Sequence, residues 1–92
     1  MSKFAKGKSW IEQRISPDAA IDGTHYTVSL LARKGTGVQG FRMTLVFLPH
    51  AGGAAVERAL PNAASTADVH RVTRELAESP ATVAALLRGG AA

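Results

Sequence analysis

The chain of 92 residues is long enough for one small domain with a single hydrophobic core. Its 46% hydrophobic and 20% charged residues are typical of a globular protein and argue against wholesale disorder. The absence of cysteine excludes disulfides, thiolate zinc sites and cysteine nucleophiles. No apolar run approaches the roughly 20 residues of a membrane-spanning helix, and no apolar stretch follows the basic first residues as a signal peptide requires. We therefore expect a cytoplasmic protein without membrane contact.

The net charge of +4 is confined to the first half of the chain. Residues 1–48 contain seven basic and three acidic side chains, whereas residues 49–92 contain four of each. Three of the basic residues, Lys3, Lys6 and Lys8, lie in a predicted flexible tail over residues 1–8. Such an asymmetry is typical either of a solvated basic tail or of a protein with an anionic partner such as nucleic acid.

The first 60 residues predict a series of antiparallel strands. Apolar and polar side chains alternate over residues 10–15, 25–33 and 41–48, which is the period of a strand with one buried face. We expect Ser16-Pro17-Asp18 to end the first strand, because proline cannot donate to a ladder. Asp22-Gly23 predicts a turn. Residues 54–60 fit either a helical turn or a fourth strand, and the glycines before them and Pro61 after them favour the strand.

After residue 65 the apolar period becomes helical. Ser65 or Thr66 is the predicted N-cap, and Asp68 in the first turn suits the helix dipole. Pro80 interrupts the pattern, which leaves two alternatives: one kinked helix, or two short and nearly collinear helices that meet at Ser79. In both cases an apolar stripe runs along the helical segment, formed by Val69, Val72, Leu76, Val83 and Leu87.

These elements predict an α+β fold, a small two-layer sandwich. A meander sheet of three or four antiparallel strands over residues 9–60 is expected to carry on one face the helical segment 65–88, with residues 89–92 as a C-terminal tail and all 92 residues in one domain. The sheet face expected under the helices consists of Ile11, Ile15, Tyr26, Val28, Leu30, Phe41, Met43, Leu45 and Phe47.

The opposite sheet face is the candidate functional surface, because antiparallel sheets commonly leave one face in water. It is expected to show Trp10, Glu12, Arg14, Thr27, Ser29, Leu31, Arg33, Arg42, Thr44 and Val46. Tryptophan and arginine are enriched at binding hot spots, which makes Trp10, Arg14, Arg33, Lys34 and Arg42 the candidate binding residues. The alternative is a solvated face on which an ion pair, such as that of Glu12 with an arginine, satisfies the charges.

No motif in the chain predicts catalysis, a cofactor or a metal. Residues 35–40 match the pattern G-x-G-x-x-G, but a strand follows them where dinucleotide binding needs a helix, so a hairpin is expected instead. His25, His50 and His70 lie too far apart in sequence for a metal motif, and no carboxylate is evident beside His50. We therefore expect a protein that is not an enzyme and that binds no cofactor.

The second half also contains a local resemblance. The stretch VTRELAESPATVAALLRG, residues 72–89, resembles the helix-turn-helix of lac-repressor-type transcription factors, in which Ser-Pro-Ala-Thr-Val opens the recognition helix. The resemblance covers 18 of 92 residues and implies DNA binding by the helix that begins at Pro80. The stretch departs from the motif at Ala77, in place of the turn glycine, and at Glu78. Alanines also stand where polar base-reading residues are needed, so the likeness predicts only a helix start.

The sequence as a whole predicts a non-catalytic binding module. The leading hypothesis is protein–protein interaction, including self-association, through the open sheet face. The alternative hypothesis is nucleic-acid binding by the same face together with Lys3, Lys6, Lys8 and Lys34.

Overall fold

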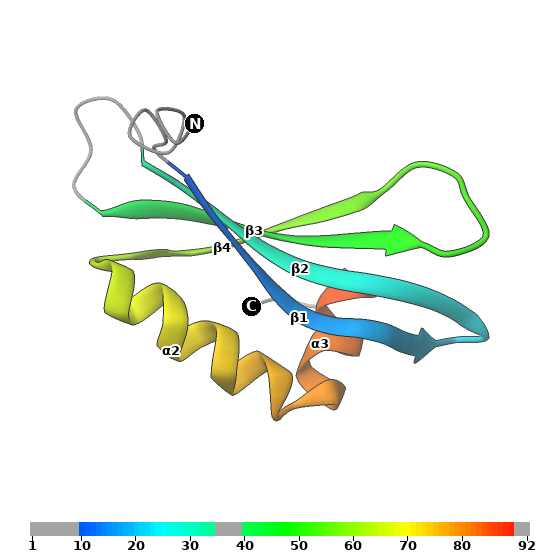
Figure 1. Ribbon diagram of the computed structural model, residues 1–92. Helices are drawn as coiled ribbons and strands as arrows, with labels where there is room; N and C mark the ends of the chain where they lie inside the picture. Colours follow the sequence, from blue (N-terminus) through cyan, green and yellow to red (C-terminus); the bar gives the residue numbers. More distant parts are fainter. Residues whose placement is uncertain (1–9, 35–39, 90–92) are drawn as a thin grey trace.

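In the computed structural model four antiparallel strands form an open sheet, and two helices lie on one side of it (Figure 1). The structure describes residues 10–34 and 40–89. The strands β1 (Trp10–Ile21), β2 (Thr24–Lys34), β3 (Phe41–Pro49) and β4 (Val56–Ala63) are neighbours in chain order, and α2 (Thr66–Ala77) and α3 (Pro80–Leu87) follow. The predicted two-layer α+β fold is thus confirmed. The predicted basic tail and most of the glycine-rich hairpin lie outside the described residues.

Strand β1 continues through the proline that was expected to end it, so the predicted end at Ser16-Pro17-Asp18 is wrong. β1 extends to Ile21, and its register with β2 shifts between Arg14 and Ser16 and again between Ser16 and Ala19. β1 is an edge strand, so Pro17 can sit in the irregular stretch without leaving a ladder partner unsatisfied. Pro17 therefore lies in an irregular stretch within the strand rather than at its end.

Strand β4 confirms the predicted fourth strand and extends it. It pairs with β3 from Val56 opposite Phe47 to Ala63 opposite Phe41, and it includes Pro61. β4 forms the other edge of the sheet, which is where a strand tolerates a proline. The sheet consequently ends at Ala63 rather than at residue 60.

The hydrophobic core lies between the sheet and the helices, on the predicted sheet face. Val28, Leu30, Leu45 and Phe47 are completely buried there, and Tyr26 meets the ring of Phe47 edge to face with centroids 6.0 Å apart. The other buried apolar residues are Ile15, Ile21, Ala32, Met43, Ala63, Val69, Leu76, Val83 and Leu86. Ile11 and Phe41, at the margin of the layer, are only partly buried.

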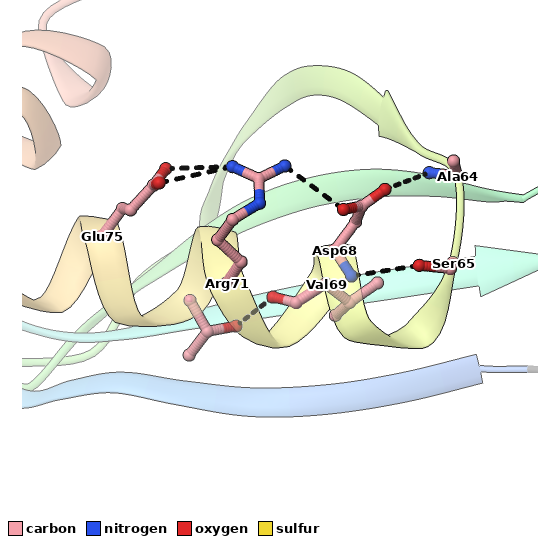
Figure 2. A network of polar contacts seen from close by, with 7 residues as sticks. Ala64, Ser65, Asp68, Val69, Arg71 and Glu75 are labelled. Atoms are coloured by element: carbon pink, nitrogen blue, oxygen red, sulfur yellow. Dashed lines mark hydrogen bonds and ion pairs between the residues drawn. The ribbon is translucent and has the colours of Figure 1, made fainter.

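Helix α2 begins with the predicted serine cap, which Figure 2 shows. The Ser65 hydroxyl accepts a hydrogen bond from the backbone N–H of Asp68 at 3.2 Å, and the Asp68 carboxylate accepts one from the N–H of Ala64 at 3.3 Å. Arg71 then bridges Asp68 and Glu75 with ion pairs of 3.4 and 3.3 Å. These two carboxylates raise the pKa of the Arg71 guanidinium. Side chains at the start of α2 therefore accept hydrogen bonds from two backbone N–H groups, those of Ala64 and Asp68.

The helical segment consists of two helices, and they are not collinear. Ser79 has the non-helical angles φ −134° and ψ 70°, Pro80 opens α3, and Figure 1 shows α3 turning away from the line of α2. The change of direction buries Leu86 and leaves Leu87, the predicted member of the stripe, only partly buried. The end of α3 is held by Arg58 of β4, which donates to the carbonyls of Leu86 and Leu87 at 2.9 Å each.

Candidate functional site

The sheet face away from the helices, called the open face below, is ordered in rows by the strand register. Trp10 of β1, Arg33 of β2 and Arg42 of β3 form the row at one end. The following rows along the strands are Glu12–Leu31–Thr44–Ala59, then Arg14–Ser29–Val46–Glu57, then Thr27–Leu48. Because side chains alternate along each strand, these residues point away from the buried ones on the helix-covered side.

Four of the five candidate binding residues share the open face, and Lys34 does not. Trp10, Arg14, Arg33 and Arg42 are all exposed there, and the exposed fraction of Trp10 is 39%. Lys34 pairs with Phe41, whose side chain packs against the core, so by alternation the lysine belongs to the helix-covered side at the end of β2. Lys34 is exposed but contributes its charge to the other side of the sheet.

The two arginines at the end of the open face lie directly opposite each other. Arg33 and Arg42 are register partners in β2 and β3, a position where like charges repel. In the described part of the chain, no ion pair includes either of them or Arg14. The expected pairing of Glu12 with an arginine is likewise not formed there. The ion pair expected in the solvated-face alternative is thus not formed among these residues, while all three arginines are exposed to solvent.

The middle of the open face is a shallow hollow with an apolar floor. Its volume is about 440 Å³, and its lining residues are Trp10, Glu12, Arg14, Thr27, Ser29, Leu31, Arg33, Val46, Leu48 and Glu57. The exposed fraction of Leu48 is 52%, and Leu31 and Val46 are partly exposed beside it. Leu48 and Glu57 were missing from the prediction. Extending the alternation of Thr44 and Val46 by one step identifies Leu48 as a residue of the open face. The position of Glu57 could not be predicted in this way, because the sequence left open whether residues 54–60 form a strand.

At the other end of the face two histidines meet one carboxylate, which the sequence did not predict. His25 Nδ1 lies 2.6 Å from Asp18 Oδ1, and the rings of His25 and His50 stack with centroids 6.3 Å apart. His50 Nε2 lies 2.9 Å from the Thr27 hydroxyl and 3.1 Å from the Pro17 carbonyl. The irregular stretch of β1 and the turn after β3 bring these residues together. His50 Nδ1 lies 4.0 Å from the same Asp18 carboxylate.

The polar contacts within the histidine cluster involve Thr27 and Asp18 as well as the two imidazoles. The Thr27 hydroxyl lies 3.1 Å from the Pro17 carbonyl and 2.9 Å from His50 Nε2, and the tautomer of His50 decides which of the two accepts its proton. Asp18 lies nearer to His25 than to His50, so it does not orient the imidazole beside Thr27. Among residues 10–34 and 40–89, no group of three His, Cys, Asp or Glu side chains is arranged to hold a metal ion.

The helix layer has a hollow of similar volume, about 460 Å³, whose lining contains no charged side chain: Leu60, Pro61, Leu76, Ala81, Thr82, Ala85 and Leu86. The predicted helix start at Ser79-Pro80 is confirmed, and the exposed side chains of α3 include Ala81 and Ala85, which have no polar group to hydrogen-bond to a base. Within the described residues no helix has the length and apolar character of a membrane span. Comparison of the chain with protein-family models, with curated proteins and with solved structures gives no match.

Proposed function

We propose that the protein is a non-catalytic binding module whose open face contacts another protein. The observation that supports this function best is the hollow, where exposed Leu48 lies with Leu31 and Val46 among charged and hydroxyl side chains. Protein interfaces typically combine such an apolar centre with a polar rim, and their energy is concentrated on tryptophan and arginine anchors. Trp10 and Arg33 stand at the border of this hollow.

Nucleic-acid binding by the same face is the weaker candidate. Glu12 and Glu57 lie on the open face among the three arginines, so the face does not form the continuous basic track that follows a phosphate backbone. Lys34 belongs to the other side, and Lys3, Lys6 and Lys8 lie outside the described residues. Electrostatic binding to an arbitrary duplex would show as affinity that falls with salt, with a log–log slope of about −0.9 per neutralised phosphate.

A peptide selection tests the proposed function without a known partner. A random peptide library displayed on phage is selected against the immobilised full chain, and enriched peptides are measured in solution by fluorescence anisotropy. We expect Leu48→Glu to weaken their binding about tenfold or more, because it places a charge in the apolar floor. The matched control Ala85→Glu adds the same charge on the exposed side of α3 and should leave binding unchanged. Failure to enrich any peptide, or equal binding by Leu48→Glu and wild type, would refute the proposal.

A further inference from the structure

We infer that the open face recognises an acidic segment of a partner protein, whose carboxylates meet Arg33 and Arg42 while an apolar side chain of the same segment enters the hollow. This inference rests on the proposed function and adds the chemistry of the partner. Its basis is the direct opposition of Arg33 and Arg42 in one row of the open face, with the apolar hollow beside them.

Three of the four described arginines outside the open face have ion-pair or hydrogen-bond partners within the molecule, whereas Arg74 is exposed on α2 and forms no ion pair with the described residues. Arg71 is paired with Asp68 and Glu75, Arg88 holds Asp22 through two hydrogen bonds of 2.9 and 3.0 Å, and Arg58 donates to the end of α3. Arg33 and Arg42 lie opposite each other and belong to no ion pair of the described residues. An anion placed between them would replace mutual repulsion by two attractive contacts.

A carboxylate-bearing peptide fits the surroundings of these arginines better than a phosphate chain. Residues two apart on one strand are separated by about 7 Å, so Leu31 lies one step and Val46 two steps from the arginine row. An extended segment with an acidic residue at the arginines would therefore place an apolar side chain in the hollow two to four residues later. Glu57 borders the hollow and would repel a continuous polyanion but not an apolar side chain.

A second copy of this chain is a poorer occupant. If two open faces met about a two-fold axis parallel to the strands, Arg33 of one copy would oppose Arg42 of the other. If the axis ran across the strands through the middle of the face, the arginine row would meet the histidine end, whose carboxylate Asp18 is already 2.6 Å from His25. Neither symmetric arrangement supplies the carboxylates that the two arginines lack.

The test uses the peptides selected against the full chain, because the library itself has no charge bias. We expect the enriched peptides to have an excess of Asp and Glu, with an apolar residue two to four positions away. Each peptide is then compared with a twin in which Asn and Gln replace Asp and Glu. We expect the twins, and the variants Arg33→Gln and Arg42→Gln, to bind about tenfold more weakly. Arg74→Gln removes the same charge from an exposed position on α2 and should not change binding.

The variants are expected to fold, because the two arginines form no ion pair with the described residues. Arg33→Gln and Arg42→Gln should match or exceed the wild-type melting temperature, since each removes the like-charge contact. Enriched peptides that bind through Leu48 but show no acidic excess would overturn this inference and leave the proposed function intact. Tighter, Arg33-dependent binding of an oligo-dT strand, or a dimer in sedimentation equilibrium that Arg33→Gln strengthens, would also overturn it.

Discussion

Replacing Gly40 by alanine tests how closely the start of β3 packs against the end of β4. Gly40 has φ +81°, and a Cβ there would lie less than 3.0 Å from the carbonyl oxygen of Ala63, a backbone atom that cannot rotate away. The left-handed conformation costs an alanine about 1–2 kcal/mol, and forced backbone displacement costs roughly another 1–3 kcal/mol. The expected loss of unfolding free energy is therefore about 2–5 kcal/mol.

The matched control for this substitution is Gly23→Ala. Gly23 has nearly the same φ, +84°, but no atom lies within 4 Å of its Cβ position, so only the conformational cost of about 1–2 kcal/mol applies. Urea denaturation followed by circular dichroism measures both variants, and in thermal melts each kcal/mol should lower the midpoint by about 4–8 °C. Equal losses for the two variants would refute the steric argument, because they differ in the contact of the new Cβ and not in φ.

Three further substitutions test other parts of the fold. Arg58→Met removes both hydrogen bonds to the end of α3 and should cost about 1–3 kcal/mol in urea denaturation; an unchanged midpoint would contradict the capping role. Phe47→Ala empties the centre of the core and should cost about 3–5 kcal/mol. Hydrogen bonds from Arg88 lower the pKa of the Asp22 carboxyl from 3.8, so the ion pair stabilises the fold above that pH and the contribution is lost as the pH falls through the lowered pKa. Asp22→Asn should thus be less stable than wild type at pH 7, with a difference that closes below about pH 4 rather than staying constant.

The buried layer of the sheet was predictable from local pattern. Val28 and Leu30 on β2, and Leu45 and Phe47 on β3, alternate with polar or smaller side chains, and a period of two permits only one set to face the helices. Alternation requires no knowledge of the partner strand, which is why the sequence alone located this face of the core.

The ends of elements were less predictable because they depend on neighbours. Pro17 and Pro61 lie inside edge strands, and their missing N–H is harmless only because no further strand pairs there. The end of α3 is likewise held by Arg58 of β4, a contact that the apolar period of the helices does not encode. Position within the sheet, rather than local composition, decided these features.

The candidate site was predictable as a face but not in its detail. Alternation placed Trp10, Arg33 and Arg42 together, but their opposition in one row follows from the register of β2 with β3. The histidine end of the face was not predictable from alternation alone. The register shifts of β1 and the turn after β3 bring together Asp18, His25 and His50, which are separated by 7 and 25 residues in the sequence. Such long-range encounters leave no periodic signal in a single sequence.

The arginines that contact α3 or the first turn differ from the two facing arginines of the open face, which form no ion pair with the described residues. Arg58 and Arg88 join the end of α3 to β4 and to the turn after β1, so their loss should affect unfolding. Arg33 and Arg42 oppose each other on the open face, so their loss should spare or raise stability. Arrangements that cost stability are characteristic of functional surfaces. A binding defect without a folding defect is therefore the result that would distinguish a functional arginine pair from a structural one.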